Sequence, residues 1–213
     1  MEFSRLIELV GDEPVFRTEI LLAGDVDPND VRRQLSRWVS AGLLYQLRRG
    51  VYALMPPFQR VKAHPFVVAN RMVRGSYVSL HSALAYCSLI PEGVPVVTSV
   101  STSRPSRWNT PLGSYEFRHI KVDLCFGYHL EEVSPGQRAF VAMPEKALLD
   151  LAYLHAGGDN PAYLRELRLQ NLERLDLNVL CHLAERTGKP KLRRMAAYVG
   201  ELANAEAEEY EPL

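Results

Sequence analysis

The segment DPNDVRRQLSRWVSAGLLYQLRRGVYAL, residues 27–54, decides the fold of the N-terminal part of this 213-residue chain. Asp27-Pro28 is a typical helix start, because Asp accepts a hydrogen bond at the N-cap and proline needs no N–H partner at the first helical position. The spacing predicts a helix from Pro28 to about Ala41, ended by Gly42. After Gly42 the apolar period changes to two, which predicts a hairpin of strands over 43–47 and 51–54 around Arg48-Arg49-Gly50.

The predicted helix has one apolar face and one basic face. At about 100° per residue, its apolar side chains fall on a single arc: Val31, Leu35, Trp38 and Val39. Arginine can bind guanine or phosphate through two parallel hydrogen bonds, and asparagine can bind adenine. We therefore expect DNA contacts from the opposite arc, which carries Asn29, Arg32, Arg33, Ser36 and Arg37.

Charge is segregated along the first 91 residues. Residues 1–30 contain eight acidic and two basic residues, and residues 31–91 contain nine basic residues and no acidic one. The whole chain has 25 basic and 25 acidic residues, but a local field of one sign attracts polyanions regardless of net charge. An arginine-rich helix face is usually only a solvated surface; the acid-free segment and the basic hairpin favour DNA here.

Two further helices are predicted before Pro28, over residues 3–10 and 18–22. Helix, short helix, longer helix and basic hairpin is the order of a winged helix-turn-helix, which we predict over residues 1–57. Its third helix would enter the major groove while the hairpin contacts phosphate or the minor groove. This interpretation adds Arg48, Arg49 and, just past the domain, Lys62 to the expected DNA contacts.

Residues 58–213 are predicted to form a second, mixed α/β domain, so the chain belongs to the α+β class. Strands are expected over 94–100 and 115–120, and helices over 66–73 and 80–89, the latter capped by Ser79. From about residue 144 the pattern is helical, with Asp176 as an N-cap, and the acidic tail 206–213 is expected to fray. No apolar run approaches the length of a membrane span, and three widely spaced cysteines fit a reducing, cytoplasmic compartment.

Several segments resemble one known family. The residues that carry the resemblance are RRGVYAL (48–54), YVSLHSAL (77–84), LIPE (89–92), TSV (98–100) with Arg104-Pro105, YEFRHI (115–120), AMPEKALLDL (142–151) and KLRR (191–194). In this order they are similar to segments of AbiEi-type antitoxins, the regulator half of type IV, abortive-infection toxin–antitoxin pairs. The resemblance spans nearly the whole chain, and PEKALLD is its most distinctive piece. Cys87-Ser88 stands where the family pattern has His-Gly.

The resemblance implies a transcriptional repressor that binds inverted repeats in its own promoter. It also implies a partner, a nucleotidyltransferase-type toxin, which the C-terminal domain opposes with or without a stable complex. Candidate surfaces for that partner or for nucleic acid are the basic residues Arg104, Arg107, Arg118, Arg193 and Arg194. The oligomeric state stays open between a monomer and a DNA-assisted dimer.

Two other functions compete with this one. The chain could be a stand-alone winged-helix transcription factor whose C-terminal domain senses a ligand or dimerises. It could also be a nuclease using Glu145, Lys146 and Asp150, but these residues fall on one predicted helix, where Lys146 and Asp150 form an i,i+4 pair. We favour the structural interpretation, and likewise for Ser79, His81 and Ser82, which lack a nucleophile elbow. We therefore expect no catalytic residue, metal site or cofactor.

Overall fold

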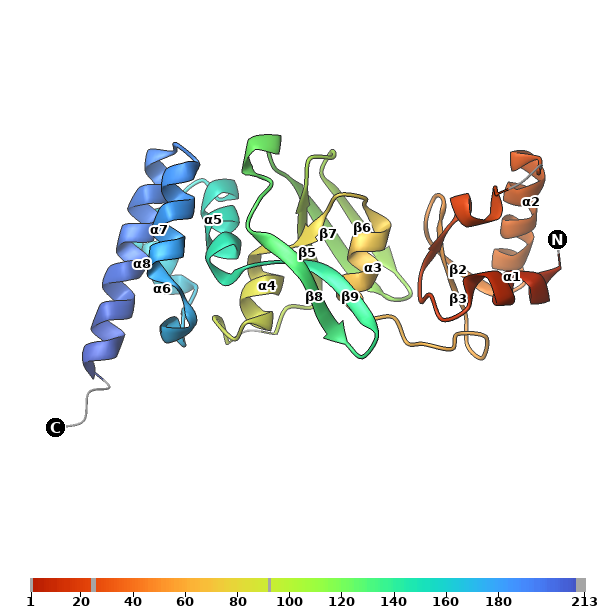
Figure 1. The fold of residues 1–213 in the computed structure, drawn as a ribbon, viewed down its shortest axis with the longest axis horizontal. Helices are drawn as coiled ribbons and strands as arrows, with labels where there is room; N and C mark the ends of the chain where they lie inside the picture. Colours follow the sequence, from red (N-terminus) through yellow and green to blue (C-terminus); the bar gives the residue numbers. More distant parts are fainter. Residues whose placement is uncertain (1, 24–25, 92, 210–213) are drawn as a thin grey trace.

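The structure is a computed structural model that describes residues 2–23, 26–91 and 93–209. Glu92 of the LIPE segment and residues 210–213 of the predicted tail lie outside the described residues. The protein is a mixed α+β molecule with two β-sheets. It is elongated: an N-terminal unit occupies one end, the larger sheet the middle, and the last helices the other end (Figure 1).

The N-terminal unit contains the elements expected from the sequence. They are α1 (Phe3–Val10), β1 (Phe16–Arg17), the 3₁₀ helix η1 (Thr18–Leu21), α2 (Pro28–Ser40), β2 (Leu44–Arg48) and β3 (Val51–Leu54). The predicted start of α2 is confirmed, because the Asp27 carboxylate accepts a hydrogen bond from the Asn29 N–H at 2.7 Å. The short strand β1 was not predicted.

The three-stranded N-terminal sheet, in the order β1-β3-β2, is covered on both faces. Tyr52 and Leu54 of β3 pack with α1 and α2 in the first hydrophobic core, whereas Val51 and Ala53 belong to the core of the rest of the chain. All four residues of β3 are therefore buried. The sheet joins the N-terminal unit to the body of the protein through apolar contact.

The larger sheet has the strand order β6-β7-β5-β4-β9-β8. Its strands are β4 (Tyr77–Val78), β5 (Val96–Ser101), β6 (Ser106–Thr110), β7 (Gly113–His119), β8 (Tyr128–Ser134) and β9 (Gln137–Ala142). β4–β9 and β5–β7 are parallel pairs, and the other pairs are antiparallel. The sequence predicted β5 and β7, but not the two edge strands β6 and β8.

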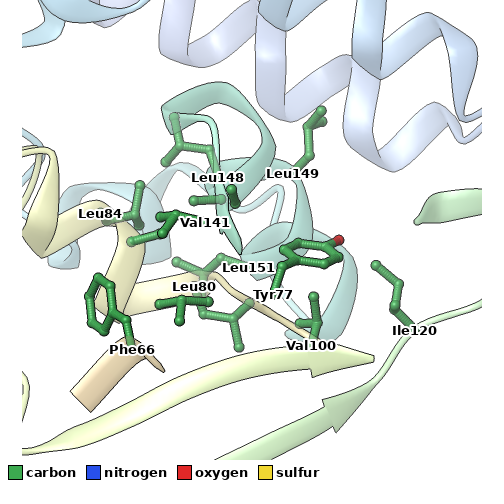
Figure 2. Packing of buried hydrophobic residues seen from close by; sticks show 14 of the residues in the cluster. Phe66, Tyr77, Leu80, Leu84, Val100, Ile120, Val141, Leu148, Leu149 and Leu151 are labelled. Carbon is green, nitrogen blue, oxygen red and sulfur yellow. The ribbon is translucent and has the colours of Figure 1, made fainter. Parts of the chain in front are cut away.

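Helices α3 (Pro65–Met72) and α4 (Leu80–Tyr86) and the 3₁₀ helix η2 (Val122–Leu124) accompany this sheet. Helix α4 ends three residues earlier than predicted, and Ser88, just after it, has a left-handed backbone with φ +61°. Figure 2 shows Tyr77 of β4 among Val100 of β5 and the leucines of α5, so α5 closes the core over the sheet.

The C-terminal part is helical from residue 144, as predicted. It consists of α5 (Pro144–Leu154), α6 (Pro161–Glu166), the 3₁₀ helix η3 (Leu172–Arg174), α7 (Leu177–Arg186) and α8 (Pro190–Glu209). Asp176 is confirmed as the N-cap of α7, because its carboxylate accepts hydrogen bonds from two backbone N–H groups at 2.9 and 3.0 Å. In the described part of the acidic tail, α8 continues through Glu209.

Candidate nucleic-acid interface

Helix α2 presents a polar face to solvent. Leu35 and Trp38 anchor it, with at most 5% of either residue exposed. The side chains expected to touch DNA are all exposed: Asn29, Arg32, Arg33, Ser36 and Arg37. The structure thus brings these five residues together on one face, and Figure 1 shows α2 at the end of the molecule opposite α8.

The arginines of this face have local partners that a ligand can displace. Arg33 forms a salt bridge with Asp30 at 2.5 Å, and Arg32 donates to the side-chain oxygen of Asn29 at 3.1 Å. Arg37 has no salt-bridge partner among the described residues. Exposed pairs of this kind contribute at most about 1 kcal/mol, so a phosphate can replace them at little cost.

The two arginines of the hairpin lie in different environments. A bulge between Gln46 and Arg48 precedes a tight turn in which Gly50 takes a positive φ of +79°, and the Thr18 N–H donates to the Gly50 carbonyl at 3.1 Å. Arg49 is exposed at this tip. Arg48 is half-buried with no hydrogen-bond partner for Nε, and burial beside Arg17 lowers its pKa. Of the two hairpin arginines expected to contact DNA, Arg49 is exposed and Arg48 is half-buried.

The basic residues just past the N-terminal unit are neutralised by the acidic segment that begins the chain. Salt bridges join Arg60 to Asp12 at 3.8 Å, Arg71 to Glu13 at 2.7 Å and Arg74 to Glu19 at 3.6 Å. A hydrogen bond to its own backbone, with Arg17 and Arg74 nearby, lowers the pKa of Glu19. Acidic and basic residues that lie in separate segments of the sequence are thus partly paired in the folded protein.

Two further basic residues, Lys62 and Arg17, lie at this junction. Lys62 is exposed and has no salt-bridge partner among the residues described, while its carbonyl accepts from the Gln137 amide at 3.0 Å. Arg17, which the sequence did not single out, donates to the Arg71 carbonyl at 3.1 Å and so ties β1 to α3. No local pattern indicates that contact, because its partner is 54 residues away.

The candidate basic residues of the C-terminal domain lie in two separate places. Arg104 and Arg107 flank and form part of β6, beside the N-terminal unit, whereas Arg193 and Arg194 lie on α8 at the opposite end (Figure 1). Arg118 pairs with Glu116 at 3.3 Å, and Arg194 with Asp159 at 2.7 Å. The group on β6 and β7 and the group on α8 are therefore separate candidate surfaces.

The acid–lysine group of α5 is a buried structural network. Lys146 and Asp150 form a salt bridge with side chains 2% and 1% exposed. The other Asp150 oxygen accepts hydrogen bonds from the hydroxyls of Tyr77 at 3.0 Å and Ser79 at 2.8 Å. Burial raises the pKa of the Asp150 carboxyl, against the opposing effects of Lys146 and the two hydroxyls. Ser79 precedes α4 as predicted, but its side chain binds Asp150 instead of capping the helix.

The remaining residues of these motifs are also engaged in structure. The Glu145 carboxylate accepts a hydrogen bond from the Asp176 N–H at 2.9 Å, which links α5 to the start of α7. Ser82 donates to the Val96 carbonyl at 3.3 Å and accepts from the Thr98 N–H at 2.8 Å. Over the described ranges, no cluster of three or more His, Cys, Asp or Glu side chains is placed to share a metal ion.

No family model matches the chain, and no curated protein matches it. Within the described part of the chain, every helix is too short or too polar to span a bilayer.

Proposed function

We propose that this protein binds double-stranded DNA through an N-terminal winged helix-turn-helix and represses transcription from its own promoter. The observation that carries the proposal is the exposed face of α2, where three arginines, Asn29 and Ser36 lie together above a buried anchor of Leu35 and Trp38. In this proposal α2 enters the major groove, and Arg49 at the hairpin tip contacts the backbone. Inverted repeats in the promoter are the expected target.

Electrostatics supports the same surface. Arg60, Arg71 and Arg74 each lie beside an acidic residue that reduces the local positive field, whereas Arg32, Arg37, Arg49 and Lys62 have no salt bridge within the described residues. Each phosphate neutralised adds about 0.9 to the slope of log affinity against log salt. With three or four such contacts, a single copy should show a slope of roughly −3 to −4.

The experiment measures binding of the promoter duplex by fluorescence anisotropy over a range of salt concentrations. Arg32→Ala or Arg37→Ala should weaken binding, by about 1–3 kcal/mol where the arginine reads a base. Where it binds phosphate, the slope should fall by about one instead. Arg71→Ala is the matched control, since Arg71 already pairs with Glu13. Equal losses in all three variants would count against this interface.

We further propose that the protein is the antitoxin of a type IV pair and acts in the cytoplasm against a nucleotidyltransferase-type toxin. The support is the resemblance of residues 48–54, 77–84 and 142–151 to AbiEi-type antitoxins. Since Glu145, Lys146 and Asp150 are at most 4% exposed, the most distinctive of these segments supports the fold and offers no contact surface. Any toxin contact would involve exposed residues such as Arg104, Arg107 or Arg193.

Co-expression with the neighbouring gene tests the antitoxin role. A neighbour that arrests growth alone and is neutralised by this protein would support it. Neutralisation should survive Arg37→Ala if it requires no DNA binding. A neighbour without toxicity would leave a stand-alone regulator.

One observation favours that second candidate, a ligand-sensing regulator. A cleft of about 900 Å³ lies between the N-terminal unit and the larger sheet, lined among others by Tyr45, Arg60 and Lys62. Gln59 also lines it, with its side-chain Nε2 buried and without a hydrogen-bond partner. Thermal-shift measurements with small carboxylates and phosphates test this candidate, which requires a stabilisation that Lys62→Ala removes.

A further inference from the structure

Strand β8 is an open edge of the larger sheet. The sheet ends at β6 on one side and at β8 on the other, but the two edges are protected differently. β6 packs against β2 of the N-terminal unit. Within the described residues, β8 pairs only with β9. It contains no proline or lysine, and the features that protect it are Glu131, Glu132 and the bulge at its C-terminal end.

An apolar row crosses this edge. Tyr128, Leu130 and Phe140 are exposed to 39%, 50% and 44%. Leu130 stands opposite Phe140 in the β8–β9 register, and the rings of Tyr128 and Phe140 are 5.9 Å apart. Large apolar side chains gathered on an unpaired strand are typical of a surface that is covered by a partner.

The register of β8 limits how a partner strand can add. Residues 128–132 pair regularly with β9, and the register shifts between Glu132 and Ser134. The regular stretch is therefore centred on Leu130. In an antiparallel pair of identical strands, opposite residues lie on the same face, so a two-fold axis must pass through a residue position.

We propose that two copies of this chain dimerise by antiparallel pairing of their β8 strands about Leu130. In this register Leu130 meets Leu130 of the second copy, and His129 stands opposite Glu131 of the second copy. Within one chain His129 and Glu131 are already hydrogen-bonded at 2.8 Å. The dimer brings two His129 and two Glu131 side chains together in alternating order around the axis.

Side-chain complementarity favours this register over its neighbours. A shift of one residue toward the N-terminus would put His129 opposite His129, and a shift the other way would put Glu131 opposite Glu131. Like charges directly opposite each other destabilise strand pairs, whereas opposite charges and apolar pairs stabilise them. Only the register centred on Leu130 places an apolar pair at the two-fold axis and sets His129 opposite Glu131 on both sides of it.

The dimer would join two six-stranded sheets into one continuous sheet and relate the two N-terminal units by a two-fold axis. That symmetry matches an inverted repeat, but the pairing itself does not depend on DNA binding. Failure of one proposal therefore leaves the other testable.

Sedimentation equilibrium of the full chain without DNA tests the pairing. The wild type should approach twice the 24.1 kDa chain mass with increasing concentration. His129→Glu should raise the dissociation constant by about tenfold, because it places two like-charged pairs across the axis. Glu131→Lys alone should also weaken the dimer, and His129→Glu with Glu131→Lys should restore it, because glutamate then faces lysine.

Val122→Ser is the matched control, since Val122 is 72% exposed and lies outside the row; it should leave the dimer unchanged. Far-ultraviolet circular dichroism confirms that each variant is folded. A wild type that stays monomeric at about 100 µM would overturn the proposal, as would a dimer that survives both His129→Glu and Leu130→Lys. A charge-swapped double variant no stronger than its single variants would exclude this register.

Discussion

Replacing Lys146 by methionine tests the account of the buried network directly. Methionine keeps most of the side-chain volume but removes the only cation paired with Asp150, whose side chain is 1% exposed. Removing one partner of a buried ion pair typically costs about 3–5 kcal/mol. Because a domain is stable by only about 5–15 kcal/mol, Lys146→Met should lower the urea midpoint strongly at pH 7.5.

The pH dependence of the stability lost in Lys146→Met tests whether the unpaired Asp150 carboxylate is its cause. Burial raises the pKa of Asp150, and Lys146 opposes the rise through its charge and its hydrogen bond. Without Lys146 the pKa of Asp150 in the folded protein rises further. The Lys146→Met variant therefore takes up a proton at Asp150 on folding. Its stability is then greatest at low pH and is lost as pH increases through the folded-state pKa. The loss of unfolding free energy relative to wild type should shrink as pH falls. The change is up to about 1.4 kcal/mol per pH unit between the Asp150 pKa values of the two folded proteins.

Urea unfolding followed by circular dichroism at pH 7.5 and 5.5 measures both effects. Asp150→Asn in the Lys146→Met background should recover about 2 kcal/mol at pH 7.5, because it removes the unpaired buried charge. Lys121→Met, an exposed replacement, should change stability by no more than about 0.5 kcal/mol. A deficit that grows toward low pH, or no recovery with Asp150→Asn, would refute the reasoning.

Three further predictions concern the fold and the interface. Gly127→Ala should destabilise more than Gly136→Ala in urea unfolding: both residues have positive φ, at +69° and +71°, but only at Gly127 would a Cβ meet the Lys146 side chain at 3.1 Å. The shared conformational cost is about 1–2 kcal/mol, and overpacking should add about 1–3 kcal/mol at Gly127; equal effects would contradict the close contact. Asp176→Ala should cost about 1 kcal/mol through loss of the α7 cap, and Asp176→Asn should retain most of that stability; equal losses in the two variants would argue against capping. Arg74→Ala, which removes one of the two arginines paired with Glu19, should leave promoter affinity and its salt slope unchanged in anisotropy titrations, and a loss comparable to that of Arg32→Ala would extend the interface beyond the N-terminal unit.

Local signals predicted the N-terminal elements well. The Asp27-Pro28 start, the apolar period of α2 and the glycine turn at Gly50 each act within a few residues, and the structure contains all three features. The edge strands β6 and β8 escaped prediction for a physical reason. Their sequences, SRWNT and YHLEEVS, are largely polar, because an edge strand needs little apolar surface.

Contacts between distant residues could not be predicted from the sequence. Ser79 resembles a helix cap locally, yet its hydroxyl donates to Asp150, 71 residues away. The acid-free segment left open whether the basic residues over 60–74 extend the DNA contact or line the domain junction, and the pairing of Glu13 with Arg71 and of Glu19 with Arg74 could not be predicted from it. Arg48 and Arg49 are neighbours in sequence, but Arg48 lies in β2, which pairs with β3, whereas Arg49 lies at the exposed hairpin tip.

The central claim is that the exposed face of α2 binds DNA. The most direct measurement is the affinity of the promoter duplex for wild type and Arg37→Ala, taken by anisotropy at several salt concentrations. The account predicts weaker binding, either with a slope reduced by about one or with relaxed preference at one base position. An Arg37→Ala protein with unchanged affinity, slope and sequence preference would contradict it.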